Sequence, residues 1–242
     1  MLPTETARKE KLLENFSLIT QKIKSACETA SKNPADVELL AVTKYASIED
    51  TRLLIETGKI KLAGESKVQD ASAKWIKGPL SDLRSAVELH FIGHLQTNKA
   101  ALAVEIFDSV DCVDSAKLAI ELNKHAAKAG RRLSVLVQLK LTDSPSQYGV
   151  APETAPALLA EIKKLSNLSP EGYMAIAPVA ENPETLRPLF ASVKNIFDRD
   201  FPERINSGSG RRNRLSLGMS GDFEQAVAEG ATLPRLGSML FE

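Results

Sequence analysis

The chain has 242 residues, which is enough for one large domain or two small ones. Hydrophobic residues make up 43% and charged residues 26%, an ordinary globular composition that excludes an intrinsically disordered chain. The 31 basic and 31 acidic residues cancel, so no net charge attracts the protein to nucleic acid or to an anionic membrane.

The sequence opens with a predicted helix that ends before Asn33-Pro34, because Leu13, Phe16 and Ile19 recur on one helical face. Short apolar runs then alternate with longer helical patterns. The predicted strands are 37–42, 59–63, 88–92, 107–113, 133–139, 170–176, 214–217 and 233–236. The predicted helices between them are 48–57, 66–77, 98–104, 152–165, 183–197 and 221–229, together with one that Asp114 caps and Gly130 ends.

Eight such alternations, with strands that are apolar on both faces, predict parallel strand pairing. In a chain of this length they close most economically as one α/β domain, a (β/α)₈ TIM barrel that spans residues 1–242 and carries an extra N-terminal helix. A doubly wound open sheet is the competing fold. No domain linker is visible, because the Gly/Ser-rich stretch 206–210 lies inside a predicted loop.

The cysteines and the chain start indicate the compartment. Cys27 and Cys112 form no CxxC pair and no disulfide framework, so we interpret them as small buried residues in a reducing environment. Residues 1–11 carry charges and no apolar run, and no stretch of ~18 apolar residues occurs, so neither a secretory signal nor a membrane span is expected. We therefore expect a cytoplasmic protein.

Function gathers at the carboxyl ends of the strands in a parallel barrel. The first strand runs into Lys44, where apolar walls would favour the neutral, nucleophilic form of an amine; a solvated loop lysine is the alternative. The seventh and eighth strands end in the small-residue segments 216–222 and 234–238, which can expose backbone N–H groups to an anion. Two tight turns with capping serines are the alternative interpretation.

Other strand ends give weaker signals. His90 and His94 follow the third strand without a carboxylate cluster, so we expect no metal site and a hydrogen-bonded His90 near the mouth. Met174 belongs to an apolar rim that could pack a flat ring, although plain barrel core explains it as well. The basic residues Arg204, Arg211, Arg212 and Arg214 lack interleaved aromatic residues, which favours a solvated loop over a nucleic-acid surface.

An activated lysine and an anion cradle on opposite sides of one barrel favour a phosphorylated aldehyde as ligand. The lysine would form an imine with the aldehyde, and the cradle would hold the phosphate. Pyridoxal 5′-phosphate fits this description, and so does the substrate of a sugar-phosphate aldolase.

Several motifs in order resemble the pyridoxal phosphate homeostasis protein family, whose fold is similar to the N-terminal barrel domain of alanine racemase. The resemblance runs from about Leu13 to Phe241, nearly the whole chain. It rests on Leu40-Ala41-Val42-Thr43-Lys44, Gly64-Glu65 with Val68-Gln69, His90 to Lys99, Leu215 to Asp222 (which includes Ser216), and Arg235-Leu236-Gly237-Ser238.

The resemblance implies a role for each matched residue. Lys44 would form the internal aldimine of pyridoxal 5′-phosphate, and Arg235 would meet the pyridine nitrogen and leave it unprotonated. Ser216 falls in the phosphate and ring segments, and His90 and Met174 would lie near the ring. The phosphate would be held by Ser220, Gly237, Ser238 and the backbone of Met219.

Two departures from the family pattern stand out. Ser66-Lys67 replaces the usual Asn-Tyr, so Ser66 would substitute in part for a cofactor-side asparagine, and Lys67 brings a second amine near the mouth. Ser146-Gln147 replaces a frequent Ser-Lys before a glycine, so the role of that lysine is missing here.

The resemblance implies a non-catalytic carrier that acts in intracellular vitamin B6 homeostasis, with no catalytic residue and no metal. Racemases of this class add a second domain that supplies a base, and we expect none here because the sequence ends at Glu242. We expect a monomer whose partners are the cofactor and the apo-enzymes that receive it. The alternative is an amino-acid racemase with Tyr45, Lys67 or His90 as its base.

Overall fold

The computed structural model describes residues 5–145, 147–203 and 212–242, so the stretch 206–210 lies outside it. Eight strands form one parallel sheet in the order β7-β6-β5-β4-β3-β2-β1-β8. The strands are β1 (Leu40–Val42), β2 (Leu62–Glu65), β3 (Glu88–Phe91), β4 (Ser109–Val113), β5 (Leu133–Leu139), β6 (Leu168–Ala175), β7 (Arg214–Ser216) and β8 (Arg235–Leu236).

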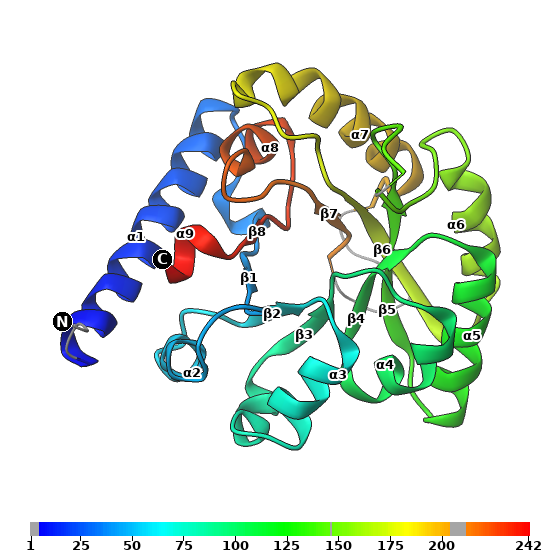
Figure 1. Ribbon diagram of the computed structural model, residues 1–242. Coiled ribbons are helices and arrows are strands. Elements are labelled where there is room, and N and C mark those ends of the chain that lie inside the picture. The colour runs from blue at the N-terminus through cyan, green and yellow to red at the C-terminus, as the bar shows by residue number, and fades with distance from the viewer. Residues whose placement is uncertain (1–4, 146, 204–211) are drawn as a thin grey trace.

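The sheet closes on itself between its last two strands. The carbonyl oxygen of Leu215 accepts a hydrogen bond of 3.1 Å from the N–H of Leu233, and that of Gly218 accepts one of 3.0 Å from Arg235. Figure 1 looks onto the carboxyl ends of the strands and shows the helices around them. The predicted (β/α)₈ barrel is confirmed, and the open doubly wound sheet is excluded.

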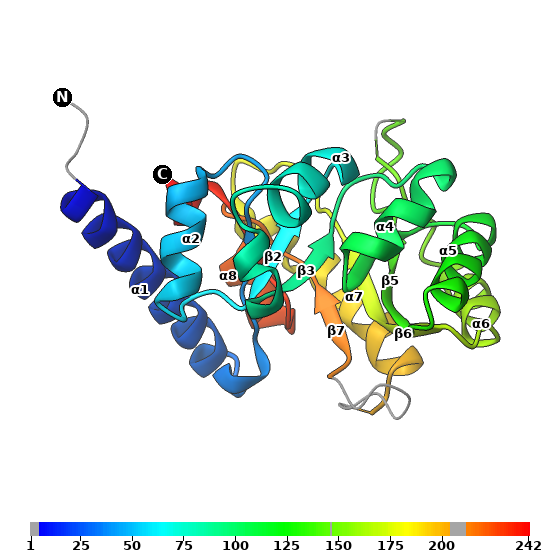
Figure 2. The same cartoon turned by 90° about the horizontal axis from the view of Figure 1, so that it is seen from below.

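Nine α-helices of the described residues surround the strands. They are α1 (Glu5–Thr29), α2 (Ile48–Glu56), α3 (Val68–Ala71), α4 (Ala100–Ile106), α5 (Ala116–Lys128), α6 (Ala155–Lys163), α7 (Arg187–Asp200), α8 (Phe223–Glu229) and α9 (Ser238–Phe241). The extra helix α1 packs against α2, α8 and α9, and Figure 2 shows it along one side of the barrel. Short 3₁₀ segments at Pro34–Asp36, Ser81–Ala86, Thr97–Lys99 and Pro183–Leu186 join these elements.

Local chemistry sets the helix starts. Ser47 caps α2, because its hydroxyl accepts from the N–H of Asp50 at 3.0 Å. The cap expected at Asp114 is wrong by one residue, since the hydroxyl of Ser115 accepts from the N–H of Leu118. The single helix expected over 66–77 is instead α3 followed by a π-helical turn, Ser72–Ile76.

The barrel interior holds charged groups as well as apolar ones. Arg214 is 5% exposed, and its guanidinium pairs with Glu88 at 2.6 Å and with Glu38 at 3.2 Å. Glu171 lies 4.0 Å from the same guanidinium and accepts a hydrogen bond of 2.9 Å from Ser134. These pairs neutralise charge at the amino ends of the strands, opposite the mouth.

The structure describes two of the four arginines in the basic cluster noted in the sequence. Arg204 and Arg211 lie outside the described residues, and Arg212 pairs with Asp36 at the surface. Arg214 is a core residue, so the solvated-loop interpretation is wrong for this position. A strand position, which alternates between barrel interior and exterior, explains the difference.

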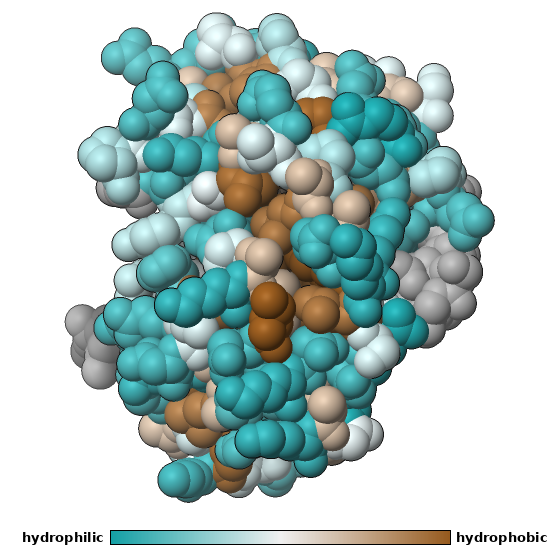
Figure 3. Space-filling model, turned by 90° about the vertical axis from the view of Figure 1, so that its right-hand side faces the viewer, coloured by the Kyte–Doolittle hydropathy of each residue, from teal (hydrophilic) through white to brown (hydrophobic). Residues whose placement is uncertain are grey.

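The surface over α5 and α6 is mostly polar. Figure 3 shows the face formed by α5 and α6 as mostly hydrophilic, with hydrophobic residues in a narrow central band. Among the described residues, no helix has both the length and the apolar character that a bilayer crossing requires.

Candidate functional site

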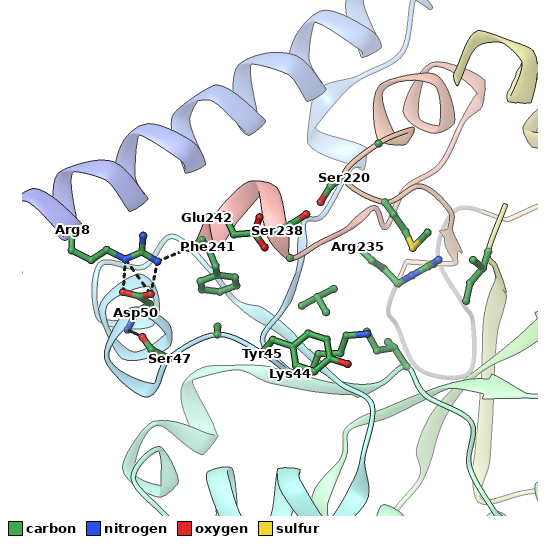
Figure 4. A pocket seen from close by; sticks show the side chains of 17 residues that line it. Arg8, Lys44, Tyr45, Ser47, Asp50, Ser220, Arg235, Ser238, Phe241 and Glu242 are labelled. Carbon is green, nitrogen blue, oxygen red and sulfur yellow. Dashed lines mark hydrogen bonds and ion pairs between the residues drawn. The ribbon is translucent and has the colours of Figure 1, made fainter. Parts of the chain in front are cut away.

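A cavity of about 550 Å³ opens at the mouth of the barrel, where β1, β7 and β8 end (Figure 4). Its size is typical of a site for a small molecule. The lining combines an amine, two small-residue loops, a guanidinium and an apolar wall. The lining residues are Arg8, Val42, Lys44, Tyr45, Ala46, Ser47, Asp50, Ile92, Ile176, Met219, Ser220, Gly221, Arg235, Gly237, Ser238, Phe241 and Glu242.

Lys44 enters the cavity two residues after β1 ends. Its side chain is exposed, and its Nζ lies 5.0 Å from the centre of the Tyr45 ring. Val42, Ile92 and Ile176 form an apolar wall of the same cavity, whereas the neighbouring Tyr45 is 87% exposed. The amine is thus accessible to a ligand that enters from solvent.

The loops after β7 and β8, which the sequence predicts as an anion cradle at 216–222 and 234–238, both line this cavity. The hydroxyl of Ser220 accepts a hydrogen bond of 3.4 Å from the N–H of Met239, which ties the two loops together. The backbone N–H groups of Ser220, Gly221 and Ser238 donate to no oxygen within the described part of the chain. Unpaired N–H groups on neighbouring loops can form a concavity that favours an anion.

Two glycines keep this cradle open. Gly218 has a φ of +89°, and a Cβ there would lie 2.8 Å from the Cα of Phe223. A Cβ on Gly237 would come within 3.3 Å of Val42 on the neighbouring strand. Larger residues at these positions would therefore move the loops that line the cavity.

Arg235 is held in the cavity wall by three hydrogen bonds of 2.8 Å. Nη1 donates to the carbonyl and the hydroxyl oxygen of Ser216, and Nη2 donates to the carbonyl oxygen of Ala175. Burial lowers the pKa of Arg235 to about 10, although Asp111 and Asp222 oppose this effect. The guanidinium thus stays charged at neutral pH, at a fixed place beside the cradle.

Three other predicted site residues lie in the barrel core and not on the cavity wall. Met174 and Ser216 are buried, and the hydroxyl of Ser216 donates to the carbonyl oxygen of Leu233 at 3.2 Å. His90 is also buried, with its Nδ1 2.8 Å from a carboxylate oxygen of Asp111. Ser216 acts on the cavity through Arg235.

A second cavity of about 610 Å³ adjoins the first and shares Lys44, Ile92 and Ile176 with it. Ser66 lines this second cavity, so the structure brings it beside Lys44 but away from the cradle. His94 also lines it and stacks on Tyr148, with ring centres 3.6 Å apart. Among the described residues, no group of three or more metal-ligating side chains occurs.

The amine and the cradle lie side by side, and the expectation that they stand on opposite sides of the barrel is wrong. The sheet order places β1 next to β8, and β8 follows β7 in the closed ring. Lys44, Ser220 and Ser238 consequently face one cavity (Figure 4).

Sequence reasoning missed the outer wall of this cavity. Arg8 of α1 pairs with Asp50 at 2.6 Å and also donates to the carbonyl oxygen of Phe241. These residues are far apart in the sequence, so no local spacing signals the contact. The extra helix α1 thereby helps to build the site.

A parallel barrel with a lysine after its first strand and an anion cradle after its last two defines the class of alanine racemase-like barrels. The family model "Alanine racemase, N-terminal domain" matches residues 16–242. A solved structure from Bifidobacterium adolescentis, described as an unknown protein, is similar at 26% identity with a TM-score of 0.85, over 99% of this chain and 98% of that one.

Two named relatives narrow the class. The pyridoxal phosphate homeostasis protein of Aquifex aeolicus is 34% identical over 94% of this chain and 96% of its own length. The structure of PipY from Synechococcus elongatus, solved with pyridoxal phosphate bound, is 34% identical with a TM-score of 0.76, over 93% of this chain and all of that one. The chain belongs to the pyridoxal phosphate homeostasis protein family.

Proposed function

We propose that this protein binds pyridoxal 5′-phosphate in the 550 Å³ cavity, through Lys44, and serves intracellular vitamin B6 homeostasis without catalysis of its own. The observation that carries the proposal is the presence of one accessible amine and one set of unpartnered N–H groups on the wall of the same cavity. The relatives named for this role and the PipY structure with the cofactor bound support it.

The residues present fit each part of the cofactor. Bound cofactor supplies an aldehyde that reacts with a primary amine, and Lys44 provides that amine. Ser220, Gly237, Ser238 and the Met219 backbone would hold the phosphate, because the cradle offers N–H groups and hydroxyls. Arg235 would meet the ring nitrogen.

The remaining predicted residues would act from behind or beside the ring. Ser216 would hold Arg235 in place, and His90 and Met174 would support the ring position from the barrel core. Ser66 would face the aldehyde side from the second cavity. An arginine at the ring nitrogen stays protonated at neutral pH, which leaves the ring a weak electron sink and supports a role without catalysis.

The candidates for a racemase base are poorly placed. His90 is fully buried and bonded to Asp111, so it cannot reach a substrate at the mouth. Lys67 is exposed, and its amine lies 3.8 Å from Asp70 outside both cavities. Tyr45 is the remaining candidate, with most of its surface exposed to solvent.

The accessible mouth also fits delivery of the cofactor to other proteins. We propose that the protein acts as a cytoplasmic, single-domain monomer, and that apo-enzymes dependent on pyridoxal 5′-phosphate are the recipients. The unpaired, buried Cys27 and Cys112 support a reducing compartment.

The first experiment is a visible absorption spectrum of the purified protein mixed with pyridoxal 5′-phosphate, with wild type beside Lys44→Ala. A yellow imine band that requires Lys44, and a borohydride-reduced adduct that peptide mapping assigns to Lys44, are expected. Lys67→Ala is the matched control and should keep the band. An adduct on Lys67, or no band, contradicts the proposed site.

A second measurement addresses catalysis. Loaded protein is incubated with a panel of amino acids in deuterium oxide, and exchange of the α-proton is followed by NMR. We expect no exchange above the rate given by free cofactor. Exchange that disappears in Tyr45→Phe would instead support the racemase alternative.

A further inference from the structure

A buried carboxylate contacts the residue that precedes Lys44. Glu65, the last residue of β2, is only 2% exposed. Its Oε1 accepts hydrogen bonds from the hydroxyl of Thr43 at 2.8 Å and from the indole N–H of Trp75 at 3.0 Å. The amine of Lys74 lies 3.2 Å from the same oxygen. Three side chains therefore converge on one carboxylate oxygen.

Lys74 also reaches the backbone next to Lys44. Its Nζ donates a hydrogen bond of 2.7 Å to the carbonyl oxygen of Thr43, and its side chain is 13% exposed. Thr43 is thus held by its hydroxyl, by its carbonyl, and by its N–H, which donates to Gly64 at 3.0 Å. Every polar group of the residue that precedes Lys44 has a defined partner.

The turn that carries this contact is unusual. Residues Ser72–Ile76 form a π-helical turn, in which Lys77 N–H donates to the carbonyl oxygen of Ser72 at 3.0 Å. This wider turn brings the sequence neighbours Lys74 and Trp75 onto one oxygen of Glu65. π-helical turns are rare and concentrate at functional sites.

Stability alone is a weak reason for this arrangement. A buried ion pair costs desolvation, and replacing one by packed apolar residues is often neutral or stabilising. Positioning of Lys44 is the better reason. Its side chain is long and exposed, and its amine must meet one carbon of a bound aldehyde. Fixing the backbone at Thr43, directly before Lys44, reduces the range of positions that the amine can take.

We propose that Glu65 and Lys74 are positioning residues, which fix the backbone at Thr43 so that the amine of Lys44 meets the aldehyde of the cofactor. The proposal rests on the proposed function, because it requires an aldehyde ligand in the first cavity. Neither Glu65 nor Lys74 lines either of the two cavities, so we expect neither to touch the ligand.

The test compares two ligands that share the phosphate and the ring. Pyridoxal 5′-phosphate has the aldehyde, whereas pyridoxine 5′-phosphate has an alcohol that cannot bond to an amine. In Lys74→Met, we expect the affinity for pyridoxal 5′-phosphate and the rate of imine-band formation to fall by about tenfold or more. The affinity for pyridoxine 5′-phosphate should stay within about twofold, since the cradle is intact.

Two further variants sharpen the comparison. Lys74→Arg keeps donors for Glu65 and for the Thr43 carbonyl, so it should recover most of the rate. Lys67→Met removes an exposed lysine seven residues earlier and should match wild type with both ligands. If Lys74→Met does not fold, Glu65→Gln replaces it, because the amide can still accept from Thr43 and Trp75 while the ion pair with Lys74 is gone.

The outcomes separate the two proposals. Equal weakening of both ligands means general distortion of the barrel and overturns the positioning role, as does a variant that matches wild type. Failure of the wild-type protein to form an imine band at Lys44 overturns the proposed function instead. A loss confined to the aldehyde ligand, with recovery in Lys74→Arg, supports the proposal.

Discussion

The guanidinium of Arg235 donates two hydrogen bonds of 2.8 Å to Ser216, one to its carbonyl oxygen and one to its hydroxyl oxygen. The two residues come from neighbouring ends of the closed barrel, β8 and β7. Ser216 is fully buried and does not line the cavity, but it holds in place the guanidinium that does. Ser216 thus influences the cavity only through its contacts with Arg235.

Ser216→Ala should therefore weaken both the fold and ligand binding. The variant removes one of the three hydrogen bonds that anchor Arg235, so we expect a loss of ~1–2 kcal/mol in the free energy of unfolding. The dissociation constant of pyridoxal 5′-phosphate should rise by about three- to tenfold. Urea unfolding and absorbance titration measure these effects. Ser192→Ala, which removes an exposed hydroxyl bonded to a carbonyl oxygen, is the control.

The cradle predicts that the protein binds a ligand with a phosphate group more tightly than the same ligand without one. In the double variant Ser220→Ala and Ser238→Ala, the affinity for pyridoxal 5′-phosphate should fall by about tenfold or more, because the proposed phosphate site loses two hydroxyls. The affinity for pyridoxal, which lacks the phosphate, should hardly change. A matching loss for both aldehydes, measured by the same titration, would place the phosphate elsewhere.

Much of this site could be predicted because its residues follow apolar strands. Lys44, Ser220, Arg235 and Ser238 each come within a few residues of a strand end, and a parallel barrel collects those ends at one mouth. Their motifs carried the resemblance, and the structure brings all four to one cavity.

The features of the site that could not be predicted depend on closure of the sheet and on irregular backbone. The adjacency of β1 and β8 follows only once the sheet is known to close, so the amine and the cradle were expected on opposite sides. The contacts of Lys74 and Trp75 with Glu65 require a π-helical turn where periodicity indicates an ordinary helix. The pair of Arg8 with Asp50 spans 42 residues and has no local signal.

Gly218 sets the course of the loop after β7. Its φ of +89° is strained for any residue with a side chain, and a Cβ would lie 2.8 Å from both the Cα of Phe223 and the Cβ of Ala226. Gly218→Ala should lower the free energy of unfolding by about 1–3 kcal/mol. Gly221→Ala is the matched control in the same loop, since a Cβ at that position would meet no other atom within 4 Å. Denaturant midpoints that coincide for the two variants would contradict this assignment.

His90 gives the barrel a pH dependence of defined sign. Burial acts to lower the pKa of His90, but Asp111 and Glu88 outweigh it and raise the pKa to about 9 from an ordinary value of 6.5. Because the folded pKa is the higher one, protonation of His90 stabilises the fold. This contribution is fully present below pH 6.5 and is lost as the pH rises through about 9.

We therefore expect the free energy of unfolding of the wild type to fall between pH 6.5 and 9 relative to that of His90→Asn, by a total on the order of 3 kcal/mol. Urea unfolding of both proteins across this range measures the difference. His94→Asn is the control, because His94 lies at the rim and its Nδ1 is 4.0 Å from the nearest Asp114 oxygen. A difference between wild type and His90→Asn that stays constant with pH would show that the buried imidazole does not hold its proton.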